Sequence, residues 1–144
     1  MENFVKNILV DAGPLIALFD KDDKYHNSVI KFLKQFNGQL ITTWPVITEV
    51  THLLSFNINV QIDFLEWLKR EAVKIINLEN IHLERIIQLS KKYSDVPMDL
   101  ADSSLIVIAE LTNITDIITI DSDYYIYKTK NKKSLNNILL SFLN

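Results

Sequence analysis

The stretch ILVDAGPLIALF, residues 8–19, joins a short apolar run to an aspartate and soon afterwards to a second apolar run. The apolar run at residues 8–10 predicts a short buried strand. Pro14 suits the first turn of a helix, so a helix is expected to follow almost at once. Asp11 would then lie at the carboxyl end of the strand, where open parallel sheets form their ligand sites. An N-cap role explains an aspartate before a helix equally well at this point.

Strand and helix patterns alternate along the rest of the chain. Apolar residues at helical spacing predict helices within residues 26–36, 45–56, 60–72, 80–95 and 99–112. Short apolar runs predict strands at residues 39–43, 73–78 and 116–121, with residues 124–128 as a candidate edge strand. Strands that alternate with helices favour a mainly parallel sheet with helices on both faces. The expectation is a single α/β domain spanning residues 1–144.

The composition excludes several classes of site. The chain has no cysteine, which removes thiolate zinc sites and cysteine nucleophiles, and its two glycines are too few for a glycine-rich phosphate loop. No segment approaches the roughly 20 apolar residues that span a bilayer, and the N-terminus lacks the pattern of a signal peptide. These features predict a cytoplasmic protein. The net charge of −3 counts mildly against broad electrostatic binding of nucleic acid.

Two aspartates directly follow predicted strands. Asp11 follows the first strand, and Asp121 follows the strand expected to end at residue 120 or 121. Because parallel strands end at the same edge of a sheet, both carboxylates would face one crevice. Asp123, two residues further on, fits a loop position as well as an accessory role beside Asp121.

Three more carboxylates lie on or beside the apolar faces of predicted helices. Glu49 lies three residues after Val46 and four before Leu53, both of which should face the core. Asp102 lies within an apolar helix face, and Asp99 precedes it by three residues on the same side. Two like charges at that spacing destabilise an isolated helix. The structural alternatives are a Glu49 that reaches solvent and an Asp99 that caps the helix.

Converging carboxylates repel one another, so either their pKa values rise or a cation holds them together. The sequence offers no Lys or Arg beside these motifs. Mg²⁺ and Mn²⁺ prefer oxygen ligands, whereas the lack of cysteine and the three scattered histidines make zinc a poor candidate. A centre of this kind supports metal-assisted hydrolysis of a phosphodiester. One carboxylate can orient or deprotonate the attacking water, so no histidine base or covalent nucleophile is required.

Four segments resemble the motifs of PIN domains, in particular the small VapC-type ribonuclease toxins of bacterial and archaeal toxin–antitoxin modules. In chain order they are ILVDAGPLIALFDKDDKYH (8–26), TTWPVITEV (42–50), MDLADSSLIVIAE (98–110) and IITIDSDYYIY (117–127). Each motif is modest alone, but the ordered set is quite specific and covers nearly all of the chain.

The resemblance implies a three-layer α/β/α sandwich with a central, mainly parallel sheet. It implies an endoribonuclease that depends on Mg²⁺ or Mn²⁺, with RNA as substrate, a cognate antitoxin protein as partner, and a homodimer. The catalytic acids that it implies are Asp11, Glu49, Asp102 and Asp121. The metal ligands that it implies are Asp11, Glu49, Asp99, Asp102, Asp121 and Asp123. Thr119 matches the small hydroxyl residue that is common just before the last acid.

Two other functions can be compared with the nuclease function. A receiver-type phospho-acceptor domain also gathers aspartates at strand ends, but it needs paired acids after its first strand and an acceptor aspartate after its third. Here Asp11 stands alone and Glu79 follows the third predicted strand, so the pattern does not fit. A non-catalytic PIN-like module that binds RNA or joins an assembly is the alternative function.

Other residues near the motifs have less specific interpretations. Four lysines between residues 128 and 133 follow the acidic turn, and either RNA phosphates or a solvated loop would explain them. The tyrosines within residues 124–127 fit core or edge positions better than base stacking, and Trp44 fits the core. Residues 134–144 match no motif, and their apolar pattern fits a helix or a strand.

Overall fold

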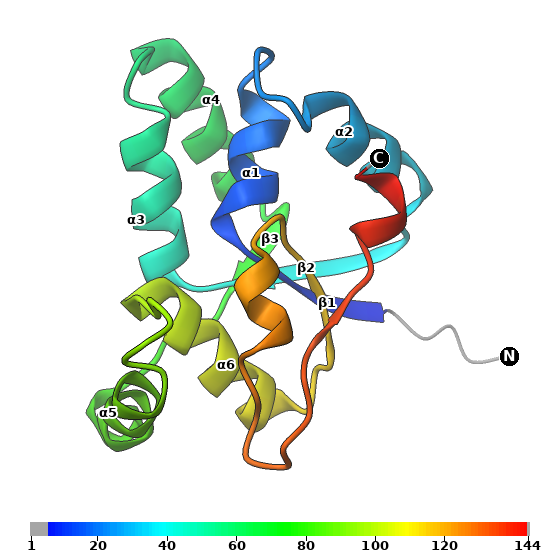
Figure 1. Ribbon diagram of the computed structural model, residues 1–144. Coiled ribbons are helices and arrows are strands. Elements are labelled where there is room, and N and C mark those ends of the chain that lie inside the picture. Colours follow the sequence, from blue (N-terminus) through cyan, green and yellow to red (C-terminus); the bar gives the residue numbers. More distant parts are fainter. Residues whose placement is uncertain (1–5, 144) are drawn as a thin grey trace, which may run out of the picture.

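The computed structural model describes residues 6–143 and contains a five-stranded sheet whose paired strands all run parallel (Figure 1). The strands are β1 (Lys6–Val10), β2 (Gly38–Thr42), β3 (Val73–Ile75), β4 (Asp116–Ile118) and β5 (Asn136–Asn137). Their spatial order is β3-β2-β1-β4-β5. Residues 1–5, on which the expected lack of a signal peptide partly rests, and residue 144 lie outside the described part.

Helices cover both faces of the sheet. They are α1 (Ala12–Phe19), α2 (His26–Gln35), α3 (Trp44–Leu53), α4 (Ile58–Lys69), α5 (Leu83–Lys92) and α6 (Leu100–Thr112). The connections from β1 to β2 and from β2 to β3 run one way across the sheet, and the connection from β3 to β4 runs back. Because such crossovers are right-handed, α1–α4 lie on one face and α5 and α6 on the other (Figure 1). The predicted three-layer α/β/α fold is confirmed.

The core surrounds β1 and α6. The last three residues of β1 are fully buried, as expected for the central strand of a sheet covered on both faces. Every residue of α6 from Ala101 to Ala109 is also buried, so this helix contacts protein on all sides. The backbone that carries Asp11 and the backbone that carries Asp102 are therefore both held by core packing.

The predicted edge strand at residues 124–128 is wrong. Ser122–Tyr125 form a short 3₁₀ helix, η2, because the Asp121 side chain accepts a hydrogen bond from the Asp123 N–H and turns the chain. Tyr124 and Tyr127 are buried with their rings edge to face. They therefore take core positions, as expected for these tyrosines, but not as part of a strand.

The buried face of α4 also differs from the expected one. The apolar spacing predicts that Ile62, Leu65 and Leu68 face the core. Leu68 is buried, but Ile62 and Leu65 are exposed, and Phe64 is buried in their place. Phe64 packs edge to face on Phe19 of α1, and its larger ring decides which side of the helix faces the sheet. None of the helices between residues 6 and 143 has the length and apolar character needed to cross a membrane.

The C-terminal segment supplies the true edge strand. β5 pairs with β4, and a 3₁₀ turn, η3 (Leu140–Phe142), follows it. The Asn137 amide donates to the Thr119 carbonyl at 3.0 Å and accepts from the Thr119 N–H at 3.3 Å. Asn137 therefore takes the place of a further strand residue opposite Thr119, just where the chain leaves β4 for Asp121.

We expect Asn137→Ala to lower the free energy of unfolding by about 1–3 kcal/mol, because the buried backbone of Thr119 would lose its partners. The control is Asn136→Ala, whose exposed side chain bonds Asp116 at the surface and should cost less than about 0.5 kcal/mol. Urea unfolding followed by circular dichroism measures both variants. Equal losses in the two would contradict the role given to Asn137.

Candidate metal centre

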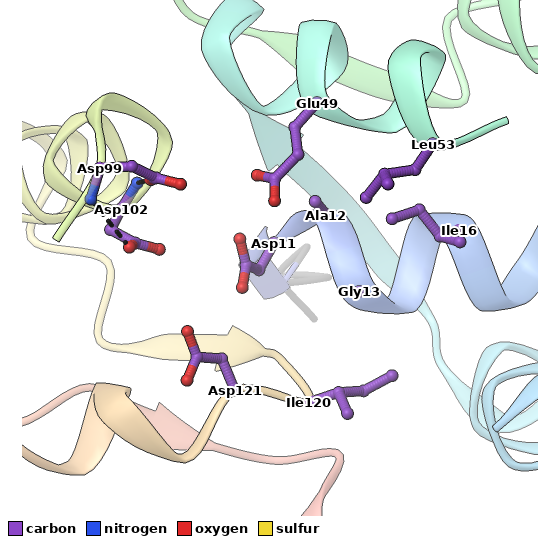
Figure 2. Close-up of a pocket in the computed structure, with 10 residues that line it drawn as sticks. All are labelled: Asp11, Ala12, Gly13, Ile16, Glu49, Leu53, Asp99, Asp102, Ile120 and Asp121. Atoms are coloured by element: carbon purple, nitrogen blue, oxygen red, sulfur yellow. Dashed lines mark hydrogen bonds between the residues drawn. The ribbon is translucent and has the colours of Figure 1, made fainter. Parts of the chain in front are cut away.

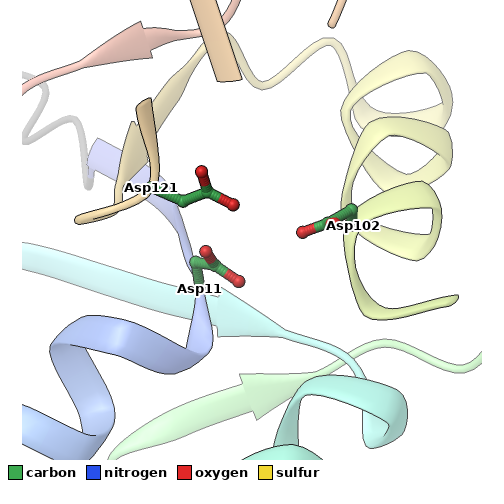
Figure 3. Close-up of side chains that lie close together, drawn as sticks. All are labelled: Asp11, Asp102 and Asp121. Atoms are coloured by element: carbon green, nitrogen blue, oxygen red, sulfur yellow. The ribbon is translucent and has the colours of Figure 1, made fainter. Parts of the chain in front are cut away.

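Three aspartates from distant parts of the sequence meet at the carboxyl edge of the sheet. Asp11 follows β1, Asp121 lies just beyond β4, and Asp102 lies in the first turn of α6. One carboxylate oxygen from each residue lies within 4.8 Å of the other two (Figure 3). The Asp11 N–H donates to the Ile118 carbonyl, which ties the ends of β1 and β4 together beneath the cluster.

The three carboxylates line a cavity of about 330 Å³ into which two further acids point (Figure 2). Glu49 reaches it from α3, and Asp99 reaches it from the residue before α6. The remaining residues found to line it are Ala12, Gly13, Ile16, Leu53 and Ile120. Within residues 6–143, no Lys, Arg or His belongs to this lining.

Asp11 has the backbone position of an N-cap, but its side chain makes no capping bond to α1. Its Oδ2 instead accepts a hydrogen bond from Thr119 Oγ1 at 3.0 Å. The residue is 6% exposed, so its carboxylate is almost fully desolvated. The N-cap alternative therefore does not explain why this side chain is an aspartate.

Asp102 and Asp99 form a reciprocal cap at the start of α6. The Asp102 N–H donates to Asp99 Oδ1 at 2.9 Å, and the Asp99 N–H donates to Asp102 Oδ2 at 3.2 Å. The capping alternative is thus correct for Asp99. Tyr124 Oη donates to Asp102 Oδ1 at 3.2 Å, so both oxygens of Asp102 accept a hydrogen bond.

Asp121 and Thr119 are linked through the turn after β4. The Asp121 N–H donates to Thr119 Oγ1, and the same hydroxyl donates to Asp11. Asp121 is the most exposed of the three clustered aspartates. Asp123 is absent from the described lining of the cavity, and its backbone N–H holds the Asp121 carboxylate instead.

Burial and mutual repulsion raise the pKa values of Asp11 and Asp102. Burial raises the pKa of Asp11 to about 6, and the charges of Glu49 and Asp121 add to this, although the nearby backbone N–H of Ala12 and the hydroxyl of Thr119 oppose it. Burial, followed by the charges of Asp11 and Asp99, raises the pKa of Asp102 to about 8.

Glu49 shows the same trend on the wall of the cavity. Partial burial raises its pKa, and the charges of Asp99 and Asp121 raise it further. Its side chain is half-buried beside the core face of α3, as expected, even though Leu53 on its far side is exposed.

Neutral groups alone hold this cluster together. The hydrogen-bond donors are hydroxyls and backbone amides, and the ion pairs of the described residues, Lys6–Asp116 and Arg85–Glu110, involve other acids. Without a cation the carboxylates must take up protons as the raised pKa values indicate. An all-oxygen set with open space beside it fits a hard divalent cation such as Mg²⁺ or Mn²⁺.

The lysines of residues 128–133 do not lie at this cavity. The Lys130 N–H donates to Glu110 in the last turns of α6, whereas Asp102 lies in the first turn of the same helix. Asp102 and Glu110 are eight residues apart, which separates the two sites by about 12 Å along the helix axis. The lysine loop is therefore not a phosphate-binding wall of the acidic cavity.

Sequence reasoning did not find the roles of Tyr124 and Asn137. Tyr124 holds Asp102 across 22 residues, and Asn137 holds Thr119 across 18. Neither contact follows from local spacing, because each depends on how η2 and β5 return to the sheet. A signal was present only in the polar pair at residues 136–137 inside an otherwise apolar tail.

Comparisons with known proteins agree with this architecture. A family model described as the PIN domain matches residues 8–130. The crystal structure of Mycobacterium tuberculosis VapC20, a sarcin–ricin-loop-cleaving toxin, matches with a TM-score of 0.75 at 14% sequence identity. The match covers 83% of this chain and 93% of that one, and at this identity it shows a shared fold. No protein of curated function matches the sequence.

In metal-free protein we expect the free energy of unfolding to fall as the pH rises from about 4 to about 8. Both carboxyls have raised native pKa values, so the native state binds more protons than the unfolded chain across this interval. Asp102→Asn cannot ionise, so it should remove most of the pH dependence and raise Tm at pH 8 by at least about 3 °C.

Thermal unfolding in EDTA at pH 5 and pH 8 measures this effect. Asp22→Asn, which changes an exposed acid outside the cavity, is the matched control and should keep the wild-type pH dependence. An Asp102→Asn protein that loses stability between pH 5 and pH 8 as steeply as the wild type would contradict the account.

Proposed function

The chain belongs to the PIN domain family, and from this we propose that it is a metal-dependent endoribonuclease, the toxin of a toxin–antitoxin pair. The observation that carries the proposal is the meeting of Asp11, Asp102 and Asp121 oxygens within 4.8 Å of one another. Asp11 and Asp102 are buried and lack a basic partner in the cavity lining, so they are arranged at a cost in stability that a bound cation would relieve.

Each acid receives a role from its place in the cavity. Asp11, Asp102 and Asp121 hold the cation, while Glu49 completes the ligand set from α3 and Asp99 from the residue before α6. We assign Asp123 a supporting role, since its N–H orients Asp121. The catalytic acids are Asp11, Glu49, Asp102 and Asp121.

A bound Mg²⁺ or Mn²⁺ would polarise the scissile phosphoryl oxygen and lower the pKa of an attacking water. Glu49 is the acid that we assign to orient that water, because it is half-buried and reaches the cavity from α3. The hydrogen bonds from Thr119 and Tyr124 keep the Asp11 and Asp102 carboxylates in place while they bind the cation.

The partners in this proposal are RNA, a cognate antitoxin and a second copy of the chain, in the cytoplasm. VapC20 is a toxin that cleaves the sarcin–ricin loop, and the fold that this chain shares with it supports RNA as the class of substrate. We propose that residues 1–144 act as one domain in this role.

The alternative is a non-catalytic PIN-like module that binds RNA or joins an assembly. Such a module has no need for clustered, desolvated carboxylates, and these are the main cost of the arrangement described above. The two proposals differ in a single property, which is cleavage that requires both the cation and the acids.

We expect the purified protein to cleave total cellular RNA in the presence of Mg²⁺ or Mn²⁺, and we expect this cleavage to stop when EDTA is added. Asp11→Asn and Asp102→Asn should each lower the cleavage rate by at least about 100-fold, because each removes a charged ligand of the cation. Mapping the cleaved ends by sequencing measures both the rate and the position.

Asp22→Asn is the matched control, since it removes one exposed carboxylate far from the cavity lining, and it should cleave like the wild type. Cleavage by Asp11→Asn at the wild-type rate would point to a contaminating nuclease. RNA binding without any cleavage, in every divalent cation tried, would favour the non-catalytic module.

The toxin role makes a prediction in cells. Induced expression should arrest growth, and Asp11→Asn expressed to the same level should not. Co-expression of a small protein from the adjacent reading frame should restore growth if it is the antitoxin. Growth curves with matched immunoblots measure this, and arrest by both forms of the protein would contradict a nuclease toxin.

A further inference from the structure

Trp44 is exposed, contrary to the core position expected for it. Trp44 is the first residue of α3 and is 53% exposed. Leu100 is the first residue of α6 and is 54% exposed. The chain has one other tryptophan, Trp67, whose ring packs on Phe19 and Phe64. Covering the exposed part of this indole with a ligand would remove apolar surface from water, which is favourable.

These two residues line a groove of about 610 Å³ that adjoins the acidic cavity. Pro45 and His52 of α3 contribute to the same groove. Glu49 and Asp99 belong to the lining of both the groove and the cavity, so the two spaces adjoin at these side chains.

We propose that this groove binds a nucleobase of the RNA strand, stacked on Trp44, next to the phosphate that is cleaved. The proposal rests on the nuclease function proposed above and names how that site holds its substrate. Unpaired bases stack on exposed aromatic rings, and any base offers such a face.

The charge of the groove favours a base over a phosphate. Its described lining contains two carboxylates and no Lys or Arg, so a phosphate placed there would be repelled. A base is uncharged and planar, and the exposed imidazole of His52 offers a hydrogen-bonding edge beside it. The phosphates would instead lie toward the cation held by the aspartates.

The spacing along α3 agrees with one strand passing both sites. Trp44 and Glu49 are five residues apart, which is about 7.5 Å along the helix axis. Two stacked nucleotide steps of about 3.4 Å cover that distance. A base on Trp44 would therefore belong to a nucleotide next to, or one removed from, the cleaved bond.

The first test uses a 12-nucleotide single-stranded RNA that the wild-type protein cleaves. Trp44→Ala should raise KM or lower kcat/KM roughly 5- to 150-fold, which is the range for one base stacked on an aromatic ring. Trp44→Phe keeps an aromatic ring and should retain most of the wild-type kcat/KM. Leu65→Ala, which removes another exposed apolar side chain, is the control and should match the wild type.

The same RNA with a single abasic nucleotide locates the base. Placed in turn at the positions flanking the cleaved bond, the abasic nucleotide should reduce cleavage by the wild type at one position. The Trp44→Ala variant should show no further loss there, since both changes remove one contact.

Fluorescence gives a readout that does not depend on cleavage. In an Asp11→Asn, Trp67→Phe protein, Trp44 is the only tryptophan, and saturating RNA should quench it. Inorganic polyphosphate carries negative charge but no bases, so it should not quench the Trp44 fluorescence. The matching control is an Asp11→Asn, Trp44→Phe protein, in which Trp67 is the only tryptophan. Its fluorescence should change little when RNA is added.

Several results would overturn the stacking site alone. One is cleavage by Trp44→Ala at the wild-type rate. Another is an abasic nucleotide that reduces cleavage equally in the wild type and in Trp44→Ala. A third is Trp44 fluorescence that does not change when RNA is added. A lower molecular mass of Trp44→Ala in solution would assign the groove to a contact between copies and would also overturn it. A wild-type protein that neither cleaves nor binds RNA would remove the nuclease proposal as well.

Discussion

The site depends on carboxylates of like charge that meet at the carboxyl edge of the sheet, and two of them, Asp11 and Asp102, are buried. Parallel strands end at one edge, so Asp11 and Asp121 meet there, and the buried helix α6 brings Asp102 to them. The resulting repulsion and burial raise the pKa values of Asp11 and Asp102. A chain shaped only for stability would replace such groups with apolar side chains. The proposed function accounts for these groups through a divalent cation that they would hold together.

Hydrogen bonds from distant parts of the chain keep these carboxylates in place. Thr119 holds Asp11, Tyr124 holds Asp102, and Asn137 in turn fixes the backbone of Thr119. The C-terminal strand therefore supports the site without reaching the cavity. Because all of these donors are neutral, they orient the charges without cancelling them, and the attraction for a cation remains.

The main architecture and the acidic positions could be predicted from the sequence, because they depend on local patterns. The run at residues 8–10 is buried because it is apolar, and Asp11 follows it by chain connectivity alone. The turn after Asp121 could not be predicted, since the same tyrosines suit an edge strand or a 3₁₀ helix. The buried face of α4 was predicted incorrectly because the sequence of this helix allows two apolar faces. Contact with Phe19 of α1 is made by the face that carries Phe64.

The central claim is that the three aspartates share one divalent cation, and anomalous diffraction from crystals grown with Mn²⁺ tests it most directly. The account predicts one or two Mn²⁺ peaks in the acidic cavity, with oxygens of Asp11, Asp102 and Asp121 at about 2.0–2.3 Å from the metal. A map without a peak there at saturating Mn²⁺, or with Mn²⁺ bound only elsewhere, would contradict it.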